Sequence, residues 1–226
     1  MTTLSESTRS RIQVFDPSQE VAVIERRLPH WSQAGTICFI TWRTWDSMPE
    51  SVLKTWLAAR DDWLIRHGID GREANWRSRL ESLTLGLVSE FQRLIADRWN
   101  DHLDECHGAC VLRRQELSRE VAKSLRHFDG ERYELTDFVV MPNHVHLLVA
   151  FPDDAKMVEQ CDSWKHFTAT RINRHLGRKH RFWQQDGFDH LVRTTEQFDY
   201  LRSYIADNPR RANLKPGESE HWSKSL

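Results

Sequence analysis

Several features are scarce in this chain of 226 residues. No apolar run approaches the roughly 18 residues of a membrane-spanning helix, and the polar start lacks the apolar centre of a secretory signal. We therefore expect no membrane association and a cytoplasmic location. The chain has only four cysteines, which without a secretory context indicate reduced thiols rather than a disulfide framework. Only three tyrosines are present, so the position of each one is informative.

An excess of charge of one sign is also lacking. The formal net charge is -1, from 32 Lys plus Arg against 33 Asp plus Glu. This balance by itself argues against a nucleic-acid-binding protein, because such proteins are usually basic overall. The average hides a local excess, however, because residues 164–185 contain basic side chains and no carboxylate.

This basic stretch predicts a surface that binds phosphate groups, and a solvated helix face is the alternative interpretation. Its basic side chains are Lys165, Arg171, Arg174, Arg178, Lys179 and Arg181, and Arg210 and Arg211 extend them further along the chain. Phe167, Phe182 and Trp183 are available there for base stacking or for core packing. Most other tryptophans, Trp45 among them, are expected to pack in the core or between helices.

The spacing of apolar residues predicts the elements of an α+β fold. We expect strands over 36–43, 132–141, 144–151 and 188–192, and helices over 51–67, 85–99, 111–126, 158–176 and 195–207. The second and third strands form a hairpin through Pro142 and Asn143, and Pro209 is expected to end the last helix.

This order of elements favours a ferredoxin- or RRM-like sandwich. Helices would pack on a central, mostly antiparallel sheet, and a helical insertion would follow the first helix. We expect a polar N-terminal arm over residues 1–34, a main domain over 35–214 with the insertion at about 70–130, and a C-terminal tail over 215–226.

Two histidines lie close together in the strand expected over 144–151. Side chains alternate along a strand, so His144 and His146 project from the same face, about 7 Å apart along the chain. Val145 and Leu147 belong to an apolar row on the opposite face, which leaves the histidine face toward solvent or a cleft. Two imidazoles can bind one metal ion, but a bare H-x-H pair is also typical of strand histidines without a ligand.

The last predicted helix carries two of the three tyrosines. Thr194 to Gln197 fits a capping box, and Tyr200, Tyr204 and Asn208 are spaced four residues apart on one face. Asn208 offers a neutral oxygen to a hard cation, and the phenol oxygen of Tyr204 is a nucleophile once its proton is removed. A core tyrosine followed by an asparagine at the helix end gives the same pattern.

The region between the predicted helices contains a rival metal site. His102, Cys106, His107 and Cys110 are close in sequence, but their spacing does not match a paired C-x-x-C zinc pattern. The spacing favours buried thiols with incidental histidines.

Longer motifs join these features in a fixed order. They are VVMPNHVHLLV (139–149), WKHFTATRIN (164–173), RFWQQDGFDHLVRT (181–194) and FDYLRSYIADNPRRANL (198–214). Over about residues 36–214 the chain resembles the single-tyrosine HUH transposases, in particular the REP-associated tyrosine transposases. It departs from their compact pattern in the length of the 70–130 region.

The resemblance implies a site and a reaction. His144, His146 and Asn208 would hold Mg²⁺ or Mn²⁺, and Tyr204 would attack the scissile phosphate to give a 5′-phosphotyrosine link and a free 3′-hydroxyl. Neutral ligands leave room for phosphate oxygens around such a cation. Tyr200 is the competing nucleophile, although it lies one turn, about 6 Å, further from Asn208 along the helix axis.

The resemblance also implies partners. These are single-stranded or hairpin DNA such as REP-like palindromes, in a prokaryotic cytoplasm, and a homodimer is compatible with the family. Three functions stay open: a metal-dependent single-stranded DNA endonuclease and strand transferase, a catalytically idle hairpin-binding protein retained by the host, and a zinc enzyme centred on the insertion.

Overall fold

The computed structural model describes residues 13–15, 22–24, 30–185 and 187–225. It divides into two compact units. The first, which we call the sheet unit, comprises Met1–Trp45 and Ala109–Leu226, and the second, the helical unit, comprises Asp46–Gly108. Most of the polar arm expected over residues 1–34 lies outside the described residues. Within it, the short strands β1 (Ala22–Ile24) and β2 (His30–Ser32) pair in antiparallel fashion.

The sheet unit is built on a five-stranded sheet of order β6-β3-β5-β4-β7, in which every neighbouring pair is antiparallel. The strands are β3 (Ile37–Arg43), β4 (Glu134–Val140), β5 (His144–Ala150), β6 (Phe188–Leu191) and β7 (Glu220–Ser223). With helices α5 (Gln115–Arg126) and α6 (Asp154–His175), the chain order β3-α5-β4-β5-α6-β6 is that of a ferredoxin-like fold. The α+β sandwich expected from the sequence is confirmed.

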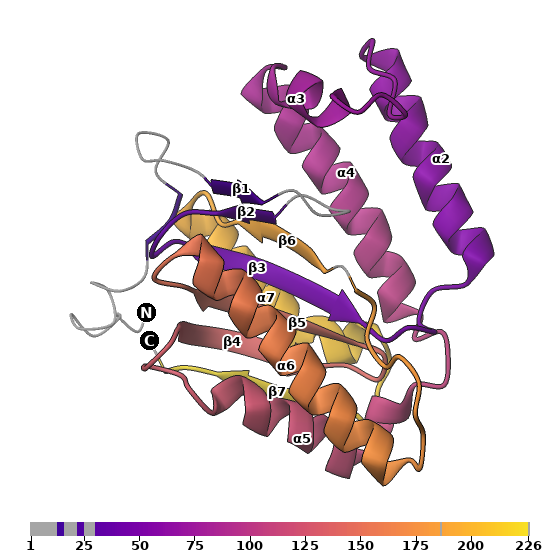
Figure 1. Cartoon of the computed structure of the whole chain (residues 1–226), viewed down its shortest axis with the longest axis vertical. Helices are drawn as coiled ribbons and strands as arrows, with labels where there is room; N and C mark the ends of the chain where they lie inside the picture. Colours follow the sequence, from indigo (N-terminus) through magenta and orange to yellow (C-terminus); the bar gives the residue numbers. More distant parts are fainter. Residues whose placement is uncertain (1–12, 16–21, 25–29, 186, 226) are drawn as a thin grey trace. The chain divides into compact units, whose positions relative to one another are not determined.

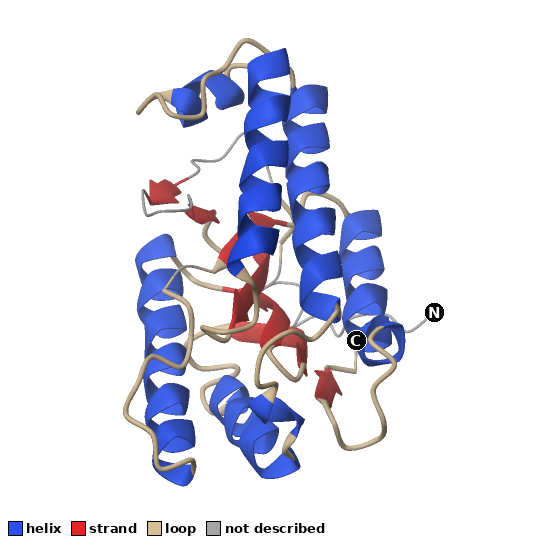
Figure 2. Ribbon diagram, turned by 90° about the vertical axis from the view of Figure 1, so that its right-hand side faces the viewer, coloured by secondary structure: helices blue, strands red, loops and turns tan. Residues whose placement is uncertain are grey.

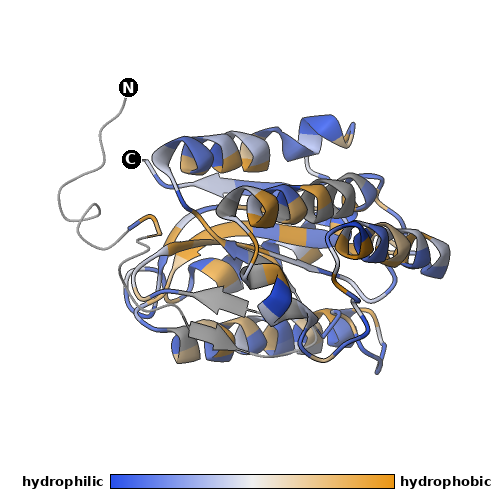
Figure 3. Cartoon of the chain, turned by 90° about the horizontal axis from the view of Figure 1, so that it is seen from above, coloured by the Kyte–Doolittle hydropathy of each residue, from blue (hydrophilic) through white to orange (hydrophobic). Residues whose placement is uncertain are grey.

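Helices cover both faces of this sheet (Figure 1). Apolar residues of α5 and α6, such as Leu117 and Trp164, share a core with Val145 and Leu147 of β5. On the other face, helix α7 (Thr195–Arg211) packs on the sheet through a second core. Hydrophobic residues are concentrated along the central strands, as Figure 3 shows. The sheet therefore separates an α5/α6 face from an α7 face.

The helical unit consists of α2 (Glu50–Arg66), α3 (Trp76–Glu81) and α4 (Leu85–Asp104). Helices α2 and α4 lie side by side (Figure 2). Trp63 is buried between them against Phe91, at 4.9 Å between ring centroids, and its indole N–H donates to Glu90 Oε1 at 2.9 Å. The unit therefore has an apolar core of its own.

The helical unit does not coincide with the insertion expected at about 70–130. It begins earlier, because α2, the expected first helix of the sandwich, packs against α4. It also ends earlier, because α5 packs on the sheet beside α6. Amphipathic spacing identifies the helices but does not say which neighbour covers the apolar face of each one.

Two local predictions at the C-terminal end are wrong. Helix α7 does not end at residue 207 but continues through Pro209 to Arg211. The expected tail over 215–226 contains β7, which pairs with β4 and forms an edge of the sheet. A proline in the last turn removes only one backbone hydrogen bond, which the packing of α7 can offset.

A bulge in β4 changes the face to which its side chains point. The register with β5 shifts between Leu135 and Asp137. As a result Leu135 and Phe138, three residues apart, both lie in the α5/α6 core. The buried carboxylate of Asp137 instead meets Arg202 of α7, with Nε 3.0 Å from Oδ1 and 2.9 Å from Oδ2.

Arg202 also joins the helix to the edge strand. Its guanidinium donates to the hydroxyl of Ser223 at 2.7 Å and to the carbonyl oxygen of Lys224 at 3.1 Å. One buried carboxylate thus links β4, β7 and the helix that carries Tyr204.

We predict that Asp137→Asn destabilises the protein by about 2 to 4 kcal/mol, because it leaves the Arg202 guanidinium without its buried counter-charge. Urea unfolding of the full chain measures this loss. The control is Asp207→Asn, which removes the exposed Asp207–Arg210 pair of the same helix and should leave the unfolding midpoint nearly unchanged. Equal destabilisation by the two variants would contradict the prediction.

Candidate active site

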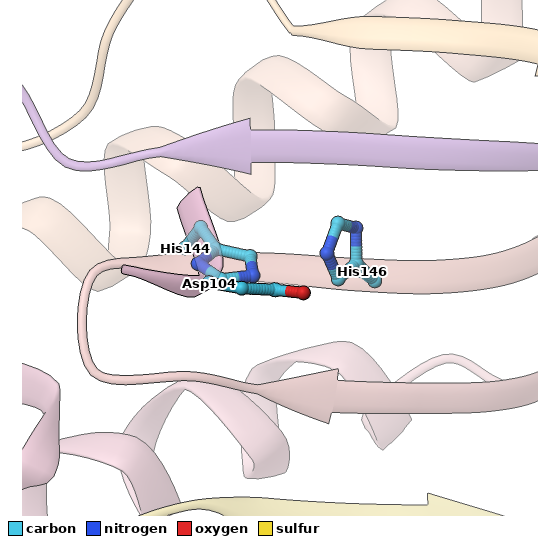
Figure 4. A group of neighbouring side chains, drawn as sticks. All are labelled: Asp104, His144 and His146. Atoms are coloured by element: carbon cyan, nitrogen blue, oxygen red, sulfur yellow. The ribbon is translucent and has the colours of Figure 1, made fainter. Parts of the chain in front are cut away.

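His144 and His146 lie on β5 and face α7, opposite the apolar row predicted from the sequence. Figure 4 shows the two side chains projecting from the strand. The expectation that this face meets solvent or a cleft is wrong, because both imidazoles are fully buried on the sheet face that α7 covers. Asp104, also drawn in Figure 4, belongs to the helical unit.

Each imidazole has a hydrogen-bond partner at Nδ1. His144 Nδ1 lies 2.7 Å from Asn143 Oδ1, and His146 Nδ1 lies 2.7 Å from the hydroxyl of Thr41. An amide oxygen can only accept, so Nδ1 of His144 carries the proton and its Nε2 keeps a lone pair. Such contacts orient imidazoles that ligate a metal and select their tautomer.

Burial keeps both rings neutral at neutral pH. It lowers the pKa of His144 to about 3. Burial, with smaller effects of His144 and Arg211, holds the pKa of His146 well below its usual range. Neutral imidazole is the form that ligates metal ions.

The spacing of the two rings also suits a shared ion. Their centroids are 4.5 Å apart, and a ring nitrogen of one lies within 4.8 Å of a ring nitrogen of the other. Two ligands of one cation at about 2.1 Å each lie roughly 3 to 4 Å apart. The histidine pair therefore fits a divalent metal after at most a small adjustment of the rings.

Tyr204 meets this pair from α7. Its hydroxyl lies 3.5 Å from His146 Nε2, and its side chain is only 8% exposed. The ring also packs edge-on against Phe39 of β3 at 6.1 Å, and the guanidinium of Arg211 lies 5.0 Å from its centroid. The structure thus brings a phenol oxygen, a pair of neutral histidines and a guanidinium together.

The competing tyrosine occupies a different environment. Tyr200 is 62% exposed, and of the two helix tyrosines only Tyr204 has a contact with the histidine pair among the described residues. Asn208 follows Tyr204 by one turn and is fully buried in α7. Its place as the third metal ligand stays a prediction.

An open groove of about 570 Å³ lies along this part of α7. It is lined by Tyr200, Ser203, Tyr204, Ala206, Asp207, Arg210 and Arg211. Arg210 is paired with Asp207, with both nitrogen–oxygen distances at 2.6 Å. Arg211 contacts Tyr204 from the same groove, so positive charge lies beside the phenol.

The basic stretch over 164–185 divides into engaged and exposed side chains. Lys165 donates to the carbonyl oxygen of Gln185 at 2.8 Å, and Arg171 pairs with Glu120 at 2.6 Å. The exposed cations are Arg174, Arg178, Lys179 and Arg181.

Trp183 does not belong to the exposed surface, contrary to its predicted role in DNA binding. It lies in the α5/α6 core, and its indole N–H donates to the hydroxyl of Thr168 at 2.8 Å. Phe182 is buried as well. Among the three aromatic residues named for this stretch, Phe167 of α6 is the exposed one.

The rival zinc cluster does not assemble within the helical unit. His102 and His107 both lie beside Glu105, at 3.7 and 2.7 Å. Among the described residues of that unit, no three His, Cys, Asp or Glu side chains bring ligand atoms together, Cys106 included. Cys110 belongs to the sheet unit.

Sequence reasoning missed the contribution of β3. The register pairs Thr41 with His146 and Arg43 with His144. Arg43 is buried, which lowers the pKa of its guanidinium to about 10 and leaves it charged at neutral pH. No periodic signal could have revealed these pairs, because strand register between segments a hundred residues apart is a tertiary property.

Comparison with known proteins finds a family match over part of the chain. Residues 110–208 match the family of IS200-like transposases. The chain thus contains a segment that is similar to the IS200-like transposases. The matched segment contains His144, His146, Tyr204 and Asn208, and it begins just after the helical unit ends.

A solved structure of a REP-associated tyrosine transposase bound to a REP hairpin is similar to this chain. The similarity covers 84% of this chain and 76% of that chain, with 15% sequence identity and a TM-score of 0.41. No curated protein matches the chain.

We predict that the metal-free protein loses stability as the pH falls below about 6.5, because the unfolded chain then binds protons that the buried histidines do not. For His144 this continues down to about pH 3, its pKa in the folded protein. Each buried histidine contributes about 1 kcal/mol per pH unit to the slope. Urea unfolding in the presence of a chelator, repeated across this pH range, measures the slope.

Replacement of single histidines tests the origin of that slope. His144→Asn should reduce it, whatever its effect on absolute stability, whereas His166→Asn, at an exposed position of α6, should not. An unchanged slope in His144→Asn would contradict the assignment.

Proposed function

We propose that the protein is a metal-dependent single-stranded DNA endonuclease and strand transferase that acts on hairpin-forming DNA, such as REP-like palindromes, through Tyr204. The observation that carries the proposal is the contact between the Tyr204 hydroxyl and Nε2 of His146, a member of a neutral, oriented histidine pair. The match of residues 110–208 to the IS200-like transposase family supports the same reaction class.

His144 and His146, with Asn208 as third ligand, would hold Mg²⁺ or Mn²⁺. When bound, the cation supplies polarisation of the scissile phosphate and stabilises charge in the transition state. Two imidazoles and one amide bring no negative charge, so phosphate oxygens can complete the coordination. Asn143 and Thr41 would keep the two imidazoles in orientation.

Tyr204 would act as the nucleophile. A bond forms between its phenol oxygen and phosphorus, the bond from phosphorus to the 3′ oxygen breaks, the phenol loses its proton and the 3′ oxygen leaves as a hydroxyl. The phosphoester is conserved in the 5′-phosphotyrosine link, so a 3′-hydroxyl can reverse the attack without ATP. Arg211 beside the ring would stabilise negative charge on the phosphate.

DNA would be held by the exposed cations of α6 and the loop that follows it. Arg174, Arg178, Lys179 and Arg181 are exposed, and no carboxylate among the described residues pairs with them. Lys165 and Arg171 would contribute only after release of their present partners. Arg210 and Arg211 extend the positive charge to the groove beside Tyr204.

One observation favours the alternative, a catalytically idle hairpin-binding protein. The Tyr204 side chain is buried, so attack requires that the phosphate reach a covered hydroxyl. Association into a homodimer and a cytoplasmic, DNA-associated setting stay predictions. Among the described residues, no helix combines the length and the apolar character of a membrane span.

We predict that the wild-type protein forms an SDS-resistant adduct with a hairpin oligonucleotide in Mg²⁺ or Mn²⁺, and that Tyr204→Phe does not. The substitution removes only the hydroxyl that would form the bond to phosphorus. Tyr200→Phe is the matched control and should form the adduct normally. Adduct formation by Tyr204→Phe would move the nucleophile to Tyr200, and tight binding without any wild-type adduct would favour the idle protein.

We further predict that the metal site needs both histidines. His144→Ala and His146→Ala should abolish Mn²⁺ binding measured by calorimetry without DNA, and Thr41→Val should weaken it about 10-fold through loss of the contact to His146. The exposed control His166→Ala should bind Mn²⁺ like the wild type. Unchanged Mn²⁺ affinity in the His144→Ala, His146→Ala double variant would refute the site.

A further inference from the structure

Trp45 is an exposed tryptophan at the carboxyl end of β3. Its side chain is 51% exposed, whereas its neighbours Trp42 and Trp183 are buried. This differs from the sequence expectation that it packs in the core. Large apolar rings left in water at one defined place commonly mark a binding site rather than a packing site.

The main chain around Trp45 is held firmly by the segment that follows the basic stretch. Its N–H donates to the carbonyl oxygen of Phe182 at 2.8 Å, and its own carbonyl oxygen accepts from the Gln184 amide at 3.2 Å. Thr44 and Trp183 form an antiparallel bridge beside it, and the backbone N–H of Gln184 donates to the carbonyl oxygen of Arg43 at 2.9 Å. The ring is therefore carried on a short extension of the sheet, and ordering it costs little when a ligand binds.

A cation already lies against this ring. The guanidinium of Arg181 is 5.0 Å from the Trp45 centroid. Arg178 and Lys179, just before it in the chain, are exposed. An aromatic face beside an arginine, within a positively charged loop, is the combination that holds unpaired nucleobases by stacking while the backbone phosphates meet the cations.

A second arginine–tryptophan pair in the sheet unit differs from Trp45 and Arg181, because its tryptophan ring is packed against another aromatic ring. Arg126 lies 5.4 Å from the ring of Trp222, but that ring also stacks on Phe138 at 5.7 Å and so has a packing role. Among the described residues, no other aromatic ring contacts Trp45.

The position of Trp45 relates it to the proposed cleavage site. Arg43, two residues earlier on β3, is the cross-strand partner of His144. A base held by Trp45 would therefore lie at the same end of the β3–β5 ladder as the histidine pair. Hairpin DNA offers unpaired bases in its single-stranded flanks as well as in its loop.

We propose that Trp45 and Arg181 form a stacking site for an unpaired nucleobase in the single-stranded flank of a DNA hairpin. The inference rests on the proposed function, because that function supplies the DNA. The indole face provides the stacking surface, the guanidinium provides the cation beside it, and the site distinguishes hairpins with single-stranded flanks from fully paired ones.

The test compares two DNA probes, a hairpin with a short single-stranded flank and the same hairpin with a blunt end, by fluorescence anisotropy with the full chain. Trp45→Ala should weaken binding of the flanked hairpin roughly 5- to 100-fold, the range for loss of one stacked base. It should leave the blunt hairpin unaffected, and Trp45→Phe, which keeps an aromatic face, should retain most of the affinity.

Arginine variants provide a charge-matched control. Arg181→Ala should weaken binding of the flanked hairpin more than binding of the blunt one. Arg126→Ala, which removes one charge beside a packed tryptophan, should change the affinity for the two probes equally. Equal affinity of Trp45→Ala and wild type for the flanked hairpin, or an equal loss on both probes, would overturn the stacking site.

The adduct assay separates this inference from the proposed function. If the wild-type protein forms the Tyr204 adduct and Trp45→Ala binds both probes normally, the stacking site is contradicted and the nuclease activity is supported. If the wild-type protein binds the flanked hairpin more tightly than Trp45→Ala does but forms no adduct, the stacking site is supported and the nuclease activity is contradicted.

Discussion

The register between β3 and β5 is the constraint on which the site depends. It pairs Thr41 with His146 and Arg43 with His144, on the sheet face covered by α7. A slip of one residue would turn every side chain of one strand to the opposite face. The Thr41 contact that orients His146 would then be lost.

Helix α7 brings Tyr204, the proposed nucleophile, to the histidine pair of β5, and the helix itself is held by a buried ion pair. The bulge in β4 turns Asp137 toward the helix, where it meets Arg202, two residues before Tyr204. Arg202 also reaches Ser223 at the end of the edge strand β7. A strand near the end of the chain thus helps to fix the helix that carries the phenol, although it contributes no residue to the proposed chemistry.

The helical unit interrupts the sandwich between β3 and α5 without dividing its core. The α5/α6 core and the α7 core are formed by residues of the sheet unit, and so is every residue of the proposed site. The family match likewise begins after the helical unit, at residue 110. The apolar core residues of the helical unit are buried against one another within that unit.

Much of this arrangement was predictable from the chain alone. Alternation along β5 placed His144 and His146 on one face, the four-residue spacing on α7 placed Tyr200, Tyr204 and Asn208 on one face, and the order of the motifs indicated a resemblance to the transposases. These are local properties, since the pleat of a strand and the pitch of a helix set them within a few residues. Only the tertiary structure decided that the histidine face is buried, that Trp183 packs while Trp45 is exposed, and that Pro209 lies inside the helix. Those outcomes depend on which distant segment covers each surface, and no local pattern carries that information.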